Sequence, residues 1–220
     1  AASGEPFTGK MRLGVIPTIA PFILPQLLGS LRTEYPDFKL YIREDLSHQL
    51  VTALHAGELD VLLLALPFPA DSVEVVSLMA DDFLLASPRQ HPLANSRTLA
   101  TADLKGEDLL LLKDGHCLRD HALEACKLRD SQISVPYQAT SLATIVQMVA
   151  NGIGVTLLPA MSVASGITAG TDIEVTPFQH AGIAREIGLM WRRKTPRAAE
   201  FRLLGDRIKN SAQPFKKGAA

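Results

Sequence analysis

The 220-residue sequence has only two cysteines and lacks several features that mark common protein classes. Two cysteines are too few for the disulfide framework of a small secreted protein. No apolar run reaches the roughly 18 residues of a membrane-spanning helix, and residues 1–8 have no apolar core of the kind that a secretory signal needs. We therefore predict a cytoplasmic protein with no membrane partner, in a compartment where thiols are normally reduced.

An excess of positive charge is also missing. The 22 lysines and arginines are balanced by 23 acidic residues, which gives a net charge of −1 and no sign of a nucleic-acid surface on this segment. The sequence has no Gly-x-Ser-x-Gly, no phosphate-binding loop and no His-Glu-x-x-His. The pair Gly152 and Gly154 lies between a predicted helix and a strand, the wrong order for a dinucleotide site, and is typical of a tight turn. We predict no cofactor.

What the sequence does contain is an alternation of apolar strands and helices. Strands are expected at 10–17, 39–44 and 61–66, with helices from Thr18 to about residue 35 and from Ser47 to Gly57. This order predicts the α/β class. Further strands are expected at 73–79, 83–87, 109–112, 136–139, 155–158, 173–177 and 185–191, further helices at 142–150 and 196–209, and a flexible segment at 162–171.

Both cysteines lie in one stretch, with eight residues between them. Residues 119–128 favour a helix, because no glycine or proline interrupts them. In an intact helix, nine steps would separate Cys117 from Cys126 by roughly 13.5 Å and place them on opposite faces. A disulfide requires Cα atoms roughly 4.4–6.8 Å apart. The two cysteines can therefore bond only if the segment unwinds.

The two thiols are expected to differ in reactivity. Cys117 follows Gly115 and His116 at the expected start of the helix, where unpaired amides and the helix dipole favour a thiolate, and His116 and Arg119 would add positive charge. Cys126 would lie in the middle of the helix, buried and inert. One reactive and one hidden thiol are typical of a redox sensor, although two unrelated buried cysteines would give the same spacing.

A metal site at this stretch is disfavoured. His116, Cys117, His121 and Cys126 are nitrogen and sulfur ligands within eleven residues. However, Cys126 would point away from the others, and His116 precedes the helix, so that a tetrahedral zinc site would require the segment to be rebuilt. We predict no metal.

Three hydroxyl residues lie at equivalent places in the predicted strand–helix pattern. Thr18, Ser47 and Ser141 each follow a strand and open a helix. In open α/β sheets, ligands bind beyond the carboxyl ends of the strands, where helix N-termini attract small polar or anionic ligands. Each hydroxyl alone could equally be a helix cap. The three together favour a cleft.

Three stretches resemble a known family. Residues 13–25 (LGVIPTIAPFILP) and 139–159 (ATSLATIVQMVANGIGVTLLP) resemble the regulatory domains of LysR-type transcriptional regulators. Residues 115–120 (GHCLRD), with a second cysteine at position 126, are similar to the redox segment of the OxyR-type hydrogen peroxide sensors within that family. The similarity covers nearly the whole chain.

The resemblance implies two Rossmann-like subdomains of the periplasmic-binding-protein type II kind, joined by two crossovers. Residues 5–79 and 186–220 would form the first subdomain, and 80–185 the second, with the redox segment. The family also carries an N-terminal winged helix-turn-helix that has no counterpart here, so we expect the chain to be a fragment that reaches promoter DNA only through that domain.

The implied function is a regulatory domain that senses hydrogen peroxide through a reversible disulfide. Cys117 would react with peroxide and Cys126 would close the bond, with Thr18, Ser47 and His116 holding peroxide and Arg185 supporting Cys117. The implied partners are a second copy in a homodimer or homotetramer, RNA polymerase for the activation of antioxidant genes, and glutaredoxin or glutathione as reductant. Two alternatives stay open: a LysR-type domain switched by a small organic ligand, and a thiol peroxidase.

Overall fold

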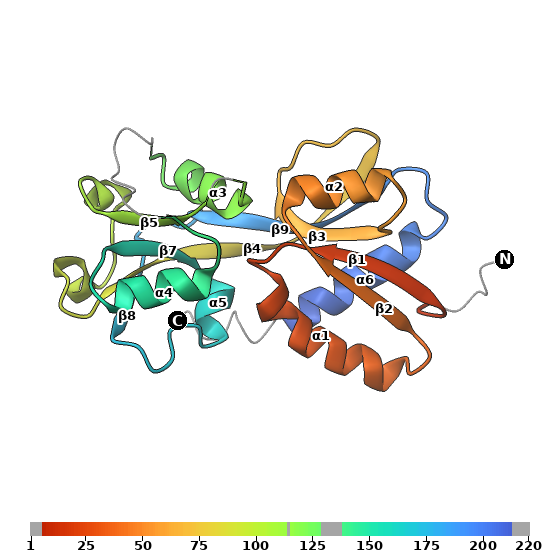
Figure 1. Cartoon of the computed structure of the whole chain (residues 1–220), viewed down its shortest axis with the longest axis horizontal. Coiled ribbons are helices and arrows are strands. Elements are labelled where there is room, and N and C mark those ends of the chain that lie inside the picture. The colour runs from red at the N-terminus through yellow and green to blue at the C-terminus, as the bar shows by residue number, and fades with distance from the viewer. Residues whose placement is uncertain (1–5, 114, 129–137, 213–220) are drawn as a thin grey trace. The chain divides into compact units, whose positions relative to one another are not determined.

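The computed structural model describes residues 6–113, 115–128 and 138–212. The chain divides into two compact units, one built from residues up to Met79 and from Glu186 onward, the other from Ala80–Arg185. Two strands, β4 (Val73–Pro88) and β9 (Ala184–Arg192), carry the chain from one unit into the other (Figure 1).

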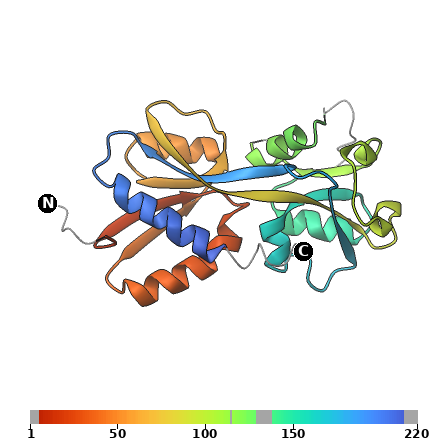
Figure 2. The same cartoon turned by 180° about the vertical axis from the view of Figure 1, so that it is seen from behind.

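The first unit is a sheet covered by helices on both faces. Its strands lie in the order β2-β1-β3-β9, with β1, β2 and β3 parallel and β9 antiparallel to β3. Helix α2 covers one face, and α1 and α6 cover the other (Figures 1 and 2). The elements are β1 (Lys10–Val15), α1 (Ala20–Glu34), β2 (Lys39–Glu44), α2 (Ser47–His55), β3 (Val61–Leu66) and α6 (Ala198–Ser211).

The core of this unit follows from its sequence. Every residue of β3 is buried, as expected for an apolar strand that is covered on both faces. Trp191 of β9 is fully buried against Phe201 of α6, with ring centroids 5.6 Å apart, and its indole N–H donates to Glu74 at 3.0 Å. Large aromatic rings of this kind account for much of the apolar area that a small core buries.

The second unit places the carboxyl ends of three parallel strands at one edge. Its strands lie in the order β4-β7-β5-β6, with β8 paired to β4. Strand β5 is parallel to both β6 and β7, whereas β7 and β8 are antiparallel to β4. The elements are β5 (Leu109–Leu112), α3 (Cys117–Ala125), β6 (Gln138–Ala139), α4 (Leu142–Ala150), β7 (Val155–Pro159), α5 (Ala160–Ala164), β8 (Ile173–Pro177), and 3-10 helices at Pro92–Asn95 and Thr101–Leu104.

The alternation of strands and helices predicted from the sequence is confirmed, and β2, β3, β5 and β8 have the predicted bounds. One prediction in this part is wrong: residues 73–79 and 83–87 form a single strand, β4, and not two. The intervening Asp81 does not break the strand because its buried carboxylate accepts hydrogen bonds from the Met161 N–H and the Arg185 guanidinium.

Two predictions concern shorter segments, at residues 162–171 and at Gly152. Part of the stretch 162–171, expected to be flexible, belongs to the short helix α5, where the Ser162 hydroxyl donates to the Pro159 carbonyl at 2.7 Å. The tight turn predicted at Gly152 is confirmed, since its φ of 77° is left-handed. A side chain at Gly154 would meet the carbonyl oxygen of Asp108. Half of the strand predicted at 136–139 lies outside the described residues.

Across the described part of the chain, the structure contains no helix with the length and apolar character needed to span a membrane.

Candidate redox site

Cys117 is the first residue of helix α3, as predicted. Strand β5 ends at Leu112, the chain turns through Gly115 with a φ of 97°, and His116 is the residue that caps the helix. The His116 side chain makes no capping hydrogen bond, and Cys117 beside it is half-buried. The positive end of a helix dipole stabilises negative charge, which is the chemistry that a reactive thiol requires.

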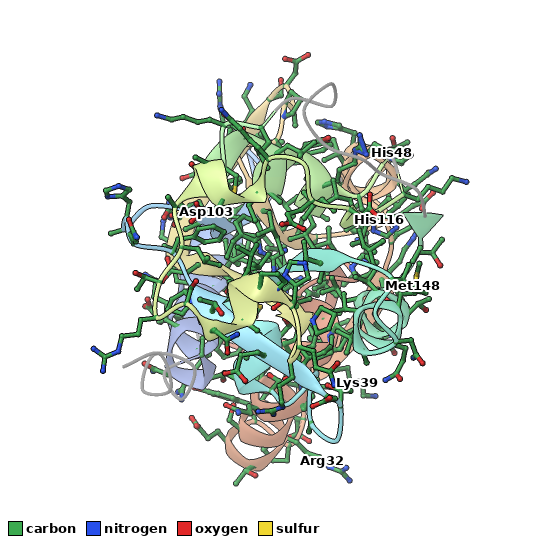
Figure 3. All side chains as sticks on the ribbon, turned by 90° about the vertical axis from the view of Figure 1, so that its left-hand side faces the viewer. Arg32, Lys39, His48, Asp103, His116 and Met148 are labelled. Carbon is green, nitrogen blue, oxygen red and sulfur yellow. The ribbon has the colours of Figure 1, made fainter. Side chains whose placement is uncertain are left out.

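His116 does not supply the positive charge that the sequence suggested. Its side chain is partly buried at the start of α3 (Figure 3), and this burial lowers the pKa of the imidazole below its ordinary value of 6.5. The ring is therefore neutral at pH 7. It can donate or accept a hydrogen bond beside Cys117, but it cannot act there as a cation.

Cys126 lies at the end of α3, and its predicted position in the middle of the helix is wrong. The helix stops at Ala125, and Cys126 is the capping residue, whose N–H donates to the Ala122 carbonyl at 3.1 Å. The predicted burial is confirmed, because only 2% of the residue is exposed. Burial raises the pKa of the Cys126 thiol to about 12, so at neutral pH this sulfur is protonated and a poor nucleophile.

The intervening helix keeps the two sulfurs apart. Both cysteines are thiols, and α3 runs without interruption from Cys117 to Ala125, with Cys126 itself in right-handed helical conformation. Nine helical steps correspond to roughly 13.5 Å and half a turn about the axis. This is far beyond the Cα separation that a disulfide tolerates. Bond formation therefore requires α3 to unwind.

A metal centre at this helix has no support. Among the residues that the structure describes, no group of three or more His, Cys, Asp or Glu side chains is placed to hold a metal ion.

The three hydroxyl residues at helix starts have different roles. Ser141 is a helix cap, since its hydroxyl accepts the Thr144 N–H at 3.2 Å. Ser47 is the first residue of α2, not its cap; it is 2% exposed, and its hydroxyl has no hydrogen-bond partner among the described residues. Thr18 precedes the capping residue Ile19, is 3% exposed and does not cap α1. Only Ser141 is explained by capping.

Thr18 and Ser47 belong to the first unit, whereas His116 and Cys117 belong to the second.

Arg185 takes part in a buried ion pair that the sequence analysis missed. Its guanidinium lies 2.9 Å from Asp81 and is fully buried, and a second guanidinium nitrogen contacts the same carboxylate at 3.0 Å. Burial raises the pKa of Asp81, while Arg185 and the Met161 N–H oppose that rise. The available signal was Asp81 itself, an acidic residue in the middle of β4, but its partner is 104 residues away in sequence.

The LysR substrate binding domain matches residues 4–213, which is nearly the whole chain. The chain therefore belongs to this family, and the predicted fold class, α/β of the periplasmic-binding-protein type II kind, is confirmed.

Within the family, the chain is similar to several proteins named as OxyR or as hydrogen peroxide-inducible genes activators. The "Probable hydrogen peroxide-inducible genes activator" of Mycobacterium leprae is 40% identical over 205 residues, covering 92% of this chain and 66% of that protein. The reduced regulatory domain of OxyR2 from Vibrio vulnificus is 38% identical with a TM-score of 0.87, covering 96% of this chain and 99% of that one. A cysteine-to-serine mutant of Corynebacterium glutamicum OxyR with hydrogen peroxide bound is 33% identical with a TM-score of 0.90, covering 96% and 66%.

These relatives are transcriptional regulators and not enzymes, as the resemblance predicted. The chain spans about two thirds of the length of the curated relatives that it matches.

Proposed function

We propose that this chain is the regulatory domain of a transcription factor that senses hydrogen peroxide through a reversible disulfide between Cys117 and Cys126. The observation that carries the proposal is the contrast within one helix: Cys117 is half-buried at its start, and Cys126 is buried at its end. A relative whose name is peroxide-inducible genes activator and a neighbour with peroxide bound support the same assignment.

The first chemical step belongs to Cys117. Its thiolate attacks one oxygen of hydrogen peroxide, a sulfur–oxygen bond forms, the oxygen–oxygen bond breaks, and the second oxygen leaves as water after taking up a proton. The product is a sulfenic acid. We propose that Thr18, Ser47 and the neutral His116 hold peroxide or the water that replaces it, and that Arg185, which belongs to the same unit as Cys117, supports it.

The second step belongs to Cys126. While α3 is intact this thiol is buried and its pKa is raised to about 12, so it cannot attack. Unwinding of α3 exposes it and restores an ordinary thiol pKa of about 8.5. Its thiolate then attacks the Cys117 sulfur, the disulfide forms, and the sulfenic oxygen leaves as water. In this order, the disulfide can close only after α3 has unwound.

In the whole protein, the unwound segment would alter packing between subunits of a dimer or tetramer and so reposition DNA-binding domains on promoter DNA. Contact with RNA polymerase and transcription of antioxidant genes would follow. Reduction through glutathione or glutaredoxin in a reducing cytoplasm would restore the thiols and allow α3 to refold.

A second candidate function is a switch driven by a small organic ligand. The observation that favours it is Ser47, whose buried hydroxyl has no partner in the described structure although it lies at the start of a nine-residue helix. A helix start with an unsatisfied donor suits a small polar or anionic ligand.

One experiment separates the two functions. The purified chain receives less than one molar equivalent of hydrogen peroxide, and its peptides are mapped by mass spectrometry without reduction. The peroxide sensor predicts an intramolecular Cys117–Cys126 disulfide, no reaction in Cys117→Ser, and a sulfenic acid that persists in Cys126→Ser. Thiols that stay unchanged in the native chain would contradict the sensor and leave the ligand switch.

A further inference from the structure

Four exposed basic residues gather at one edge of the sheet in the first unit. Strands β1, β2 and β3 are parallel and β9 is antiparallel to β3, so one edge holds the starts of the first three strands and the end of β9. Figures 1 and 2 both show the start of β1 and the chain that follows β9 on the same side of this unit. We call the four residues the basic edge: Lys10 at the start of β1, Lys39 at the start of β2, and Arg193 and Lys194 directly after β9.

Hydrogen bonds between the strand ends hold this edge together. The Arg192 guanidinium at the end of β9 donates to the Leu59 carbonyl, just before β3, at 2.8 Å. The Arg197 guanidinium, after the turn that follows β9, donates to the Lys10 carbonyl at 3.0 Å. The end of β9 and its turn therefore lie beside the starts of β3 and β1.

Nearby arginines are neutralised by carboxylates, and this distinguishes them from the basic edge. Arg12 is paired with Asp60 at 2.7 Å, and Arg197 with Glu200 at 2.7 Å. In the part of the chain that the structure describes, the four residues of the basic edge take part in no ion pair, and all are exposed. Their charges are therefore available to an anionic partner.

Two of the four residues also repel each other. Lys10 and Lys39 are direct partners in the parallel register of β1 and β2. Side chains of such partners lie on the same face of a sheet, and like charges placed there destabilise the pairing of the strands. A polyanion that binds both lysines would relieve this repulsion.

The distribution of charge along the chain is consistent with a basic surface at this place. The net charge of −1 is an average over two units that differ, because lysine and arginine outnumber the acidic residues in the first unit and are outnumbered by them in the second. The total charge, from which no nucleic-acid surface was expected, therefore conceals a local excess of positive charge.

We propose that the basic edge contacts the phosphate backbone of duplex DNA. The proposal rests on the proposed function, in which the whole protein acts on promoter DNA. In the order β2-β1-β3-β9, three steps of roughly 4.8 Å separate the outer strands, or about 14 Å in all. One strand of duplex DNA carries a phosphate about every 3.4 Å along its axis, so the edge is long enough to face about four phosphates. Such contacts strengthen binding and position the protein without reading the base sequence.

Removal of three charges from the basic edge tests the proposal. The native chain and the triple variant Lys10→Gln, Lys39→Gln, Lys194→Gln are titrated into a short fluorescent duplex of arbitrary sequence, and the anisotropy is recorded over a series of salt concentrations. The logarithm of the affinity falls with the logarithm of the salt concentration by about 0.9 for each phosphate that a cation neutralises. We expect the native chain to bind at low ionic strength, and the slope of the variant to be smaller by about 2.7.

The matched control is a second triple variant, Arg97→Gln, Lys105→Gln, Lys113→Gln. These residues are exposed, belong to the second unit and, within the described structure, take part in no ion pair. The control changes the net charge as much as the test variant does, so it separates contact at the basic edge from an effect of total charge. Its affinity for the duplex and its salt slope should match those of the native chain.

A native chain with no affinity for the duplex at low ionic strength would overturn the proposal, as would an equal loss of affinity in the two triple variants. Neither result bears on the thiols. With peroxide, the Cys117–Cys126 disulfide should form in the test variant at the native rate. Absence of that disulfide in the native chain would refute the proposed function, whatever the chain's affinity for DNA.

Discussion

At the scale of single residues, the two thiols differ because of their surroundings. Burial favours the neutral form of Cys126 and raises its pKa to about 12. For such a group, the stabilisation of the folded state is complete below the ordinary thiol pKa of about 8.5 and is lost as the pH rises toward 12. At physiological pH, the buried thiol therefore contributes its full share to holding α3 closed.

Alkylation of the Cys117→Ser variant tests this difference directly. Its remaining thiol, at Cys126, should react with iodoacetamide along a pH profile displaced toward 12, because only the thiolate reacts. The same variant unfolded in urea should show a midpoint of about 8.5, the value of an exposed cysteine. Superimposable profiles in the folded and unfolded chains would show that Cys126 is not buried.

The buried ion pair makes a second prediction at this scale. In Asp81→Asn the fully buried Arg185 guanidinium keeps its charge but loses its counterion. Breaking a buried pair in this way should reduce the free energy of unfolding by about 3–5 kcal/mol, measured by urea denaturation. Arg89→Gln, which removes an ion pair with the exposed Asp172, is the control and should have little effect. Equal stability losses in the two variants would contradict the assignment.

At the scale of elements, the sequence was informative where hydrophobic patterning decides the structure. The apolar run Val61–Leu66 could be assigned as a buried strand because a short, continuous apolar run is typical of a parallel strand that is covered on both faces. Local signals failed where distant contacts decide. Strand β4 continues through Asp81 because Arg185 pairs with it. Helix α3 ends at Ala125 although no glycine follows, because Lys127 takes the left-handed conformation.

Prediction of the candidate site from the sequence was limited in the same way. The helix start at Cys117 and the burial of Cys126 could be predicted, since both follow from residues nearby in sequence. The neutral state of His116 could not, because it depends on how much of the ring the folded chain covers. Nor could sequence alone tell the capping serine, Ser141, from Ser47, since both follow a strand and open a helix.

The two serines therefore provide a prediction for helices α2 and α4. Ser141→Ala removes the hydrogen bond to the Thr144 N–H and should lower the free energy of unfolding by about 1 kcal/mol, as loss of a helix cap typically does. Ser47→Ala removes a buried hydroxyl without a partner and should leave stability unchanged or raise it. Urea denaturation of both variants checks the contrast, and a larger loss in Ser47→Ala would refute it.

At the scale of the whole molecule, the chain offers separate reporters for its two units. Trp191, its single tryptophan, is buried in the first unit, whereas α3 and both cysteines belong to the second. We expect peroxide to unwind α3 without moving the Trp191 emission maximum, because the change is local. Urea should shift the same emission to longer wavelength. An oxidised chain that emits like the unfolded one would mean that oxidation unfolds the domain.

The central claim is that Cys117 and Cys126 can be joined only when the helix between them opens. Amide hydrogen exchange of residues 118–126, compared in the reduced chain and in the chain oxidised by peroxide, tests it most directly. The account predicts protected amides in the reduced form and their loss of protection, together with a Cys117–Cys126 disulfide, after oxidation. A disulfide between these residues with protection of the helix unchanged would contradict it.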